Sequence, residues 1–323
     1  MKAFVTGGTG FIGSNLIDYL LEKDFEIFAL VRNPQNLKWL EAKNIHILEG
    51  DLFSIPPLPS DIDFVFHIAG IGSAFKPADY YTVNQQGTAS LFQALTQQGV
   101  SPRKIIFLSS TAAAGPTTAD QKVSESTPPH PISPYGESKF RAEGEALKYS
   151  KTFPLVILRA AAVYGPRDMD FLRYFRIIKK GILPSLSGPE RLVSLCYVKD
   201  LCRALFLSTK KELPSGEIIN IAYNRPYPYD EIGITAGKIL KKKLHKLSIP
   251  RPAAFLWSVS SEFSGIISRR PNIFNRHKYR EMVQKSWVAD TTKAAEKLSF
   301  EAEYSLEEGL RKTLPWYENN GLL

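Results

Sequence analysis

The 323-residue sequence predicts an α/β fold, a doubly wound parallel sheet with a smaller C-terminal lobe. Three observations support this prediction. Short apolar runs alternate with helical patterns in the first half, a glycine-rich turn follows the first run, and the pattern changes near Gly165. Strands that alternate with helices form βαβ units, and their right-handed crossovers place helices on both faces of a parallel sheet.

The first half contains six short runs rich in β-branched or aromatic residues, which predict six strands. A helix over Phe11–Glu22 follows the first strand, because apolar residues recur every three or four positions from Ile12 to Leu20. The expected strands are Ala3–Thr6, Glu26–Val31, Ile45–Glu49, Phe64–Ile68, Lys104–Ser109 and Pro154–Leu158.

Prolines and loops become frequent after Gly165, and Ile218–Ala222 is the clearest strand there. We therefore expect residues 1–165 to form the main domain and 166–323 mainly a smaller lobe over the carboxyl edge of the sheet. The apolar stretch Leu201–Leu207 predicts that residues 195–210 return to the main domain.

The composition is that of a folded protein, with 44% hydrophobic and 23% charged residues. The two cysteines, Cys196 and Cys202, form no Cys-x-x-Cys pair, which argues against a disulfide framework and favours a reducing, cytoplasmic compartment. The five histidines lack metal-ligand spacing, so we expect no metal site. We also expect no signal peptide and no membrane span.

The formal net charge is +9, and basic residues gather at Lys241–Lys243 and Arg269–Arg270. The simplest interpretation is a solvated surface. The alternatives are attraction of a phosphorylated cofactor and contact with an anionic membrane surface. The sequence carries no module typical of nucleic-acid binding, so nucleic acid is not an expected partner.

The glycine turn after the first strand predicts a dinucleotide site. Gly7 permits the tight turn, Gly10 lets the backbone approach a pyrophosphate, and Gly13 lets the helix lie close to the sheet. The pyrophosphate would sit at the N-terminus of the helix that begins with Phe11 and Ile12. The strand and helix around the turn supply the context that this motif requires.

The end of the second strand predicts the choice of cofactor. NAD enzymes usually carry an acidic residue there for the ribose 2′-hydroxyl. This chain instead has Arg32, which suits a 2′-phosphate. We therefore expect NADP, with NAD as the alternative; Arg32 could also be an ordinary surface arginine.

A third motif predicts acid–base chemistry. Tyr135 and Lys139 are four residues apart and share one helix face. A nearby ammonium favours the phenolate of tyrosine, whose ordinary pKa is about 10. Tyr135 could then exchange a proton with a substrate oxygen that Ser110 holds by a hydrogen bond.

The motifs also carry a family resemblance over nearly the whole chain. They are Thr6–Gly13, Gly50–Leu52, His67–Gly70, Asn84, Ser109–Thr111, Tyr135–Lys139, Arg159–Pro166, Tyr197–Asp200 and Ser305–Leu310. The sequence resembles the extended short-chain dehydrogenase/reductase family, in its NAD(P)-dependent epimerase/dehydratase group. The resemblance implies a Rossmann-type NAD(P)-binding domain and a substrate-binding lobe.

The same resemblance assigns roles to individual residues. It implies a catalytic set of Ser110, Tyr135 and Lys139, supported by Asn84, with Thr111 as the fallback for the serine. Asp51 and Leu52 would flank the adenine, Ala69 would line the cofactor channel, and His67 would be structural. Together with the glycine turn, the expected cofactor-binding residues are Gly7, Gly10, Phe11, Ile12, Gly13, Arg32, Asp51, Leu52, Ala69, Tyr135 and Lys139.

Two departures from the family pattern concern the substrate. Nucleotide-sugar members commonly place an asparagine where this chain has Ala162, and an arginine where it has Val193, with Arg191 displaced by two residues. These two positions and Thr111 are the expected substrate-binding residues, and they lack a diphosphate clamp. The apolar residues Phe255, Val259, Phe263, Ile266 and Ile267 at helical spacing predict either core packing or an apolar lid.

These features favour an NADP-linked oxidoreductase that interconverts a secondary alcohol and a ketone on a small hydrophobic substrate, as in the steroid-dehydrogenase-like and flavonoid-reductase-like branches. The alternative is a nucleotide-sugar epimerase or dehydratase with a tightly bound cofactor. A non-catalytic role is disfavoured by the intact Ser110, Tyr135 and Lys139. No hydrolase elbow or phosphate loop is present. Whether two copies form a homodimer stays open.

Overall fold

The computed structural model describes residues 1–118, 121–268 and 274–323, and the side chains of 263–268 lie outside the description. Its main element is a sheet of seven strands in the order β11-β6-β5-β4-β1-β2-β3, all parallel. The strands are β1 (Lys2–Thr6), β2 (Glu26–Val31), β3 (His46–Glu49), β4 (Phe64–His67), β5 (Lys104–Ser110), β6 (Leu155–Ala160) and β11 (Glu217–Ile221).

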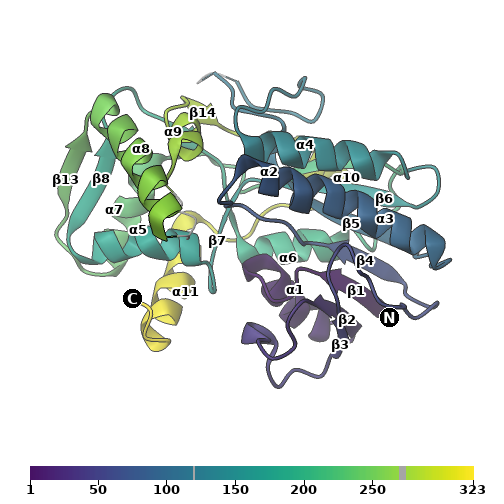
Figure 1. Ribbon diagram of the computed structural model, residues 1–323. Coiled ribbons are helices and arrows are strands. Elements are labelled where there is room, and N and C mark those ends of the chain that lie inside the picture. The colour runs from purple at the N-terminus through teal and green to yellow at the C-terminus, as the bar shows by residue number, and fades with distance from the viewer. Residues whose placement is uncertain (119–120, 269–273) are drawn as a thin grey trace.

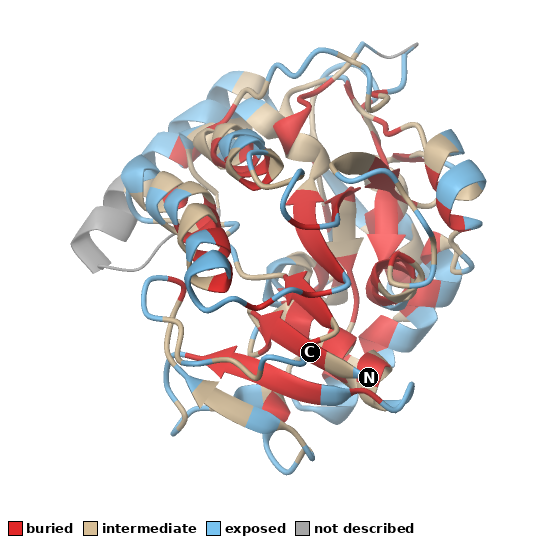
Figure 2. Ribbon diagram, turned by 90° about the vertical axis from the view of Figure 1, so that its right-hand side faces the viewer, coloured by how far each residue is buried: buried red, intermediate tan, exposed pale blue. Residues whose placement is uncertain are grey.

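Helices cover both faces of this sheet, and Figure 2 shows buried strands at the centre of the molecule. Ala3 and Val5 of β1 pack into the hydrophobic cluster on one face, whereas Phe4 packs into the cluster on the other. Successive strand residues point to opposite faces, so a doubly covered strand is apolar throughout. The predicted doubly wound parallel sheet is confirmed. The helices around it are α1 (Phe11–Leu21), α2 (Pro77–Tyr80), α3 (Gly87–Gln97), α4 (Pro134–Leu147), α6 (Val198–Leu207) and α10 (Thr292–Leu298). Short 3₁₀ helices lie at Lys38–Leu40 and Thr111–Ala113, and a π-helical segment lies at Tyr81–Gln86.

The smaller lobe consists mainly of helices and short strands, and Figure 1 shows it beside the sheet with β13 and α8 at its outer edge. Its strands pair as β12-β9-β14 and β13-β8, while β10 pairs with β7. The elements are β7 (Ala162–Tyr164), α5 (Met169–Lys179), β8 (Ile182–Leu186), β9 (Leu192–Val193), β10 (Leu195–Tyr197), β12 (Tyr227–Pro228), α7 (Tyr229–Ile239), β13 (His245–Ile249), α8 (Arg251–Ser268), α9 (Arg276–Met282), β14 (Ser286–Trp287) and α11 (Leu306–Asn319).

One predicted strand has a different place in the fold. The run Ile218–Ala222 was assigned to the smaller lobe, but β11 is the edge strand of the main sheet, with Ile219 opposite Leu158 of β6. The assignment was wrong because the partner strand lies about 60 residues earlier, and local sequence does not reveal such pairing. The other predicted boundaries agree with the structure to within two residues.

Segments of the second half return to the sheet. Helix α6 packs against α1, and α10 packs against β11. Residues after 165 thus supply α6, α10 and the edge strand β11 to the main domain. The division of the chain into two domains at residue 165 stays a prediction. In the ranges that the structure describes, no helix has both the length and the apolar run needed to cross a membrane.

Candidate active site

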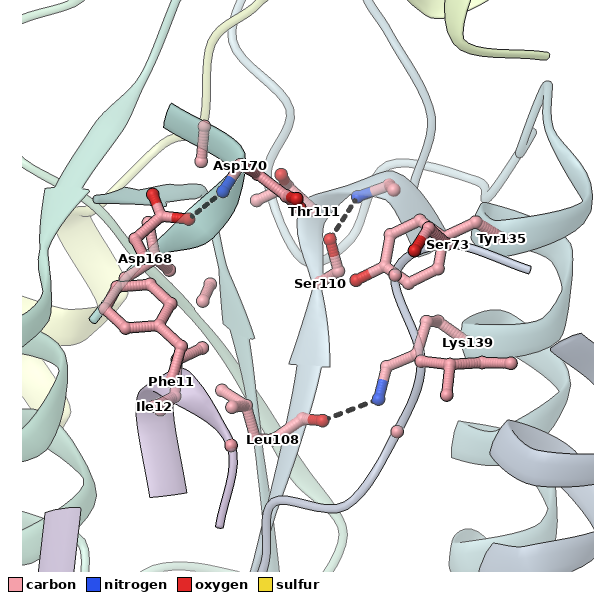
Figure 3. Close-up of a pocket in the computed structure, with 18 of the residues that line it drawn as sticks. Phe11, Ile12, Ser73, Leu108, Ser110, Thr111, Tyr135, Lys139, Asp168 and Asp170 are labelled. Atoms are coloured by element: carbon pink, nitrogen blue, oxygen red, sulfur yellow. Dashed lines mark hydrogen bonds between the residues drawn. The ribbon is translucent and has the colours of Figure 1, made fainter. Parts of the chain in front are cut away.

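A cavity of about 900 Å³ lies between the carboxyl ends of the parallel strands and the smaller lobe. Ligands of doubly wound proteins bind in this crevice, where the helix N-termini and strand ends meet. Figure 3 shows Ser110, Tyr135 and Lys139 on one side of the cavity, with Phe11 and Ile12 across from them. The cavity is therefore large enough for a dinucleotide and a second ligand.

The glycine turn has the geometry of a phosphate cradle. Gly7 has a φ of +75°, which L side chains rarely adopt. A Cβ on Gly13 would lie 2.1 Å from the Gly7 carbonyl oxygen, so only glycine fits there. Gly10 precedes α1, and its amide donates to the Gly7 carbonyl at 3.0 Å. The residues of the turn leave space at the N-terminus of α1, where an anion is stabilised.

The far end of the cavity carries two cations. Arg32 follows β2, is exposed and lines the cavity together with Lys38. Sequence reasoning missed Lys38, because nothing in its local pattern distinguishes it from a solvated lysine. Leu52 is buried against Gly87, whereas the Asp51 carboxylate accepts hydrogen bonds from the amides of its own turn. Both residues line the cavity where the adenine was expected.

Ser110 and Tyr135 come together from different elements. Ser110 ends β5, and its Oγ accepts from the Ala112 amide at 3.2 Å. Tyr135 is the second residue of α4, which Ser133 caps by accepting from the Gly136 amide at 3.1 Å. Burial raises the pKa of the Tyr135 phenol above its ordinary value, although its hydrogen bond with Ser110 opposes the shift. In this arrangement the phenol keeps its proton at neutral pH.

Lys139 lies on the same face of α4, and its ammonium contacts β5. Its Nζ donates to the Leu108 carbonyl at 2.7 Å and lies 4.7 Å from the centre of the Phe107 ring. Burial lowers the pKa of Lys139 to about 8, and the nearby Glu143 opposes this. Without a nicotinamide ring in the cavity, burial favours the protonated phenol, and the phenolate expected beside Lys139 and the cofactor stays a prediction.

A buried ion pair supports this wall of the cavity. Glu143 of α4 and Arg159 of β6 are each 2% exposed. The Arg159 guanidinium donates to both Glu143 oxygens, at 2.9 and 2.7 Å, and the Ser109 hydroxyl donates to the same carboxylate at 2.5 Å. These contacts fix α4 relative to β5 and β6. Since Tyr135 and Lys139 belong to α4, the pair fixes their positions too.

Two further predicted residues lie behind the cavity. The Asn84 amide nitrogen donates to Ser138 Oγ at 2.9 Å, and its oxygen accepts from the Ile71 amide at 2.8 Å. Asn84 does not itself line the cavity, so its place is that of a positioning residue. His67 is fully buried between the hydroxyls of Thr6 and Thr88, each 2.9 Å away. Burial lowers its pKa to about 3, which fits the structural role expected for it.

The expected substrate-binding residues all line the cavity. Thr111 follows Ser110, Ala162 begins β7, and Val193 ends β9. The wall that the lobe adds is largely apolar or aromatic; it includes Phe171, Tyr174, Pro184, Leu186, Leu195, Ile232, Met282 and Trp287. Ala69, expected in the cofactor channel, also lines the cavity, with its amide near Gly7.

Cations for a diphosphate are scarce on the lobe side. Arg191 lines the cavity, but its guanidinium donates to the carbonyls of Met282 and Leu186, each at 3.3 Å. Lys278 is paired with Glu281 at 3.1 Å. Arg176 and Lys179 of α5 instead contact the C-terminal segment and do not line the cavity.

Sequence reasoning also missed the carboxylates of this wall. Asp168 is 5% exposed and caps α5 by accepting from the Asp170 amide at 2.9 Å. Its other oxygen is buried and has no hydrogen-bond partner in the described part of the chain. Burial raises the pKa of Asp168 to about 7. Asp170, Asp230 and Glu281 line the same cavity, so four carboxylates interrupt its otherwise largely apolar lobe side.

The described residues contain no cluster of three or more histidine, cysteine or carboxylate side chains suited to a metal ion. The cavity lining presents hydroxyl, amine and carboxyl groups. A parallel sheet, a glycine turn after β1 and a Ser–Tyr–Lys group beside the cavity define an enzyme of the extended short-chain dehydrogenase/reductase type. Over residues 3–222 the chain matches the family model described as the NAD dependent epimerase/dehydratase family, and it belongs to that family.

Relatives within the family have different activities. The chain is 28% identical over 349 residues to dTDP-D-glucose 4,6-dehydratase of Mus musculus, covering 99% of this chain and 89% of that protein. It is 25% identical over 324 residues to ceramide reductase of Caulobacter vibrioides, covering 99% and 95%. The structure of UDP-glucuronic acid 4-epimerase from Bacillus cereus in complex with NAD matches with a TM-score of 0.78 and 26% identity, covering 99% of each chain.

Proposed function

We propose that this enzyme interconverts a secondary alcohol and a ketone with an NAD(P) cofactor, on a substrate that has an apolar body and no nucleotide diphosphate. The observation that carries this proposal is the meeting of Ser110, Tyr135 and Lys139 on the cavity wall opposite the phosphate cradle. That arrangement puts a proton donor and a hydrogen-bonding hydroxyl beside the space where a substrate carbonyl would lie.

Tyr135 is the proposed catalytic acid in the reducing direction. A tyrosine phenol is already protonated at neutral pH at its ordinary pKa, and burial raises the pKa of Tyr135 further. A nicotinamide cofactor held in this cavity would supply hydride chemistry for the reduction. Tyr135 gives its proton to the carbonyl oxygen while Ser110 holds that oxygen by a hydrogen bond. Lys139, with a pKa of about 8, is mainly protonated at neutral pH. Its positive charge favours the tyrosinate that is left after the transfer, until solvent restores the proton.

The cofactor is proposed to be NADP. The glycine turn with Phe11 and Ile12 would hold the pyrophosphate, since a Cβ at Gly13 would fill the cradle. Arg32 and Lys38 would hold the 2′-phosphate, because two cations line the cavity where an NAD enzyme usually has a carboxylate. NAD stays the alternative.

The substrate assignment depends on the lobe side of the cavity. Ala162 and Val193 offer no partner to a diphosphate, and the guanidinium of Arg191 is already bonded to two carbonyls. A buried diphosphate beside several carboxylates would lack the cations that must pair its charge. Apolar surface, in contrast, gains roughly 25 cal/mol for each Å² that this wall buries.

A second candidate is a nucleotide-sugar epimerase or dehydratase that returns the hydride to its substrate. The comparisons favour this candidate, since several relatives are named for UDP- or dTDP-sugars. The structure of a MoeE5 protein in complex with UDP-glucose and NAD also matches at 25% identity with a TM-score of 0.78. The residues of this chain's own cavity favour the first candidate.

Cofactor turnover distinguishes the two candidates. We expect NADPH consumption with apolar ketones, and affinity for UDP-glucose, UDP-galactose and dTDP-glucose only in the millimolar range. Tyr135→Phe should reduce turnover by about two to four orders of magnitude and leave NADPH affinity nearly unchanged. The control is Tyr80→Phe, a nearby cavity phenol whose ring centre lies 6.1 Å from that of Tyr135.

Two results would overturn these proposals separately. Normal turnover in Tyr135→Phe would remove the acid–base mechanism. Micromolar binding of any of the sugar nucleotides, with interconversion of the sugar and no net NADPH consumption, would establish the epimerase candidate in place of the reductase.

A further inference from the structure

Helix α8 exposes an apolar surface along the outer edge of the smaller lobe (Figure 1). Leu256 is 67% exposed, Trp257 53% and Phe255 43%. Between Arg251 and Glu262 the helix carries no charged residue. Contiguous exposed apolar surface of this kind marks a contact with another molecule, whereas isolated exposed leucines need no explanation.

The register of α8 explains why these side chains face outward. From 251 to 262, Ala254 and Ser258 are the only residues classed as buried. These two positions lie one turn apart on the same face, and Leu256 lies roughly 180° from their midpoint at about 100° per residue. The helix thus rests on two small residues, and Leu256 points away from the lobe.

Contacts with α9 hold the helix in this orientation. The Phe255 ring packs edge-on against Tyr279, with 5.5 Å between ring centres, and the Tyr279 hydroxyl donates to the Arg251 carbonyl at 3.3 Å. Trp257 packs with Phe274 at 4.9 Å on the other side. Leu256 has no comparable support, so the centre of the exposed surface is its most exposed residue.

Lysines lie at the beginning of the strand that leads into this helix. Lys241, Lys242 and Lys243 are all exposed, and no carboxylate in the described ranges forms an ion pair with them. By contrast, Lys246 on β13 is paired with Asp230 at 2.8 Å. In the chain, β13 lies between Lys241–Lys243 and α8, and Figure 1 shows this strand on the side of the lobe away from the main sheet.

We propose that α8 and Lys241–Lys243 form a docking surface for an anionic lipid bilayer. Interfacial helices insert Trp, Phe and Leu at the headgroup boundary, while nearby lysines attract anionic lipid. The uncharged outward face of α8 and the unpaired lysines supply these two requirements. The proposal does not depend on the substrate, because bilayer binding is measured without turnover.

Vesicle sedimentation tests this surface. The full chain should bind vesicles made from equal parts of phosphatidylcholine and phosphatidylglycerol, and bind phosphatidylcholine alone at least tenfold more weakly. Added salt should weaken the binding. Replacing Lys241, Lys242 and Lys243 with alanine should lower the partition coefficient by roughly tenfold to a hundredfold. Leu256→Ser combined with Trp257→Ser should lower it at least tenfold.

A matched control distinguishes binding through this surface from binding through the overall positive charge of the protein. Alanine at the exposed Lys122, Lys151 and Lys297, outside the smaller lobe, removes the same charge and should leave binding within about twofold of wild type. Failure of the wild type to bind anionic vesicles, or equal loss in the control, would overturn the proposal. So would a dimer in solution that Leu256→Ser with Trp257→Ser dissociates, because the surface would then serve a second copy.

Discussion

Replacing Asp168 with asparagine should change how the stability of this enzyme depends on pH. The carboxyl is 5% exposed, one of its oxygens has no partner among the described residues, and burial raises its pKa from 3.8 to about 7. As pH rises from about 4 to 7, the unfolded chain loses this proton while the folded chain keeps it. Folding is therefore progressively disfavoured over that window, and the loss is complete above pH 7.

The size of the effect follows from the pKa. A difference of roughly 3 units at 1.36 kcal/mol each gives about 4 kcal/mol between pH 4 and pH 8. Asparagine caps a helix as well as aspartate does but carries no charge. The free energy of unfolding of Asp168→Asn, relative to wild type, should therefore increase by about 4 kcal/mol over this range.

Urea unfolding at pH steps between 4 and 8 measures this difference for the protein without cofactor. Asparagine also buries an amide without a partner, which lowers the free energy of unfolding by the same amount at every pH. The quantity to compare is therefore the change in the free energy of unfolding with pH. Asp170→Asn is the control, because Asp170 lies two residues away but is exposed. A relative stability of Asp168→Asn that stays flat from pH 4 to 8 would refute the reasoning.

Three other changes have defined outcomes. Gly13→Ala should abolish NADPH binding, measured by calorimetry, and lower the melting temperature, because the added Cβ would lie 2.1 Å from the Gly7 carbonyl oxygen. The control Gly144→Ala, where the added Cβ meets open space, should change neither. Glu143→Gln leaves a buried arginine without its charge partner and should cost about 3–5 kcal/mol in urea unfolding; a cost below about 1 kcal/mol would contradict the supporting role of the pair. Arg32→Ala should weaken NADPH binding roughly 10- to 150-fold and leave NADH nearly unchanged, whereas equal wild-type affinity for both would disprove the cofactor assignment.

The parts of the fold that sequence predicted are those with a short-range signature. In β1, Phe4 and Val5 point to opposite faces of the sheet and both are apolar. A strand that helices cover on both faces requires apolar residues at every position, so its sequence is easy to detect. Gly7 and Gly13 were predictable because backbone conformation and close approach exclude other residues. The edge strand at Glu217–Ile221 was misplaced because its partner is distant in sequence, although its own apolar run was visible.

The site residues, too, fall into those with a short-range sequence signature and those that depend on distant parts of the chain. Tyr135 and Lys139 are brought together by one helical turn, so their spacing sufficed to find them. The protonation of Tyr135 was not predictable, because it depends on burial by several separate elements. Lys38 and Asp168 carry no local motif. Only the folded chain places both in the cavity wall and leaves one Asp168 oxygen without a partner among the described residues.

A hydrogen bond joins the smaller lobe to α4, the helix that contains Tyr135 and Lys139. Ser133, which caps α4 immediately before Tyr135, donates its hydroxyl to Glu281 of α9 at 2.6 Å. Glu281 also pairs with Lys278, and both line the cavity. A ligand that draws Lys278 or Glu281 towards itself must therefore alter the capping contact of α4. We therefore expect changes at Glu281 or Lys278 to alter the proton affinity of Tyr135, because Glu281 raises its pKa and Lys278 lowers it.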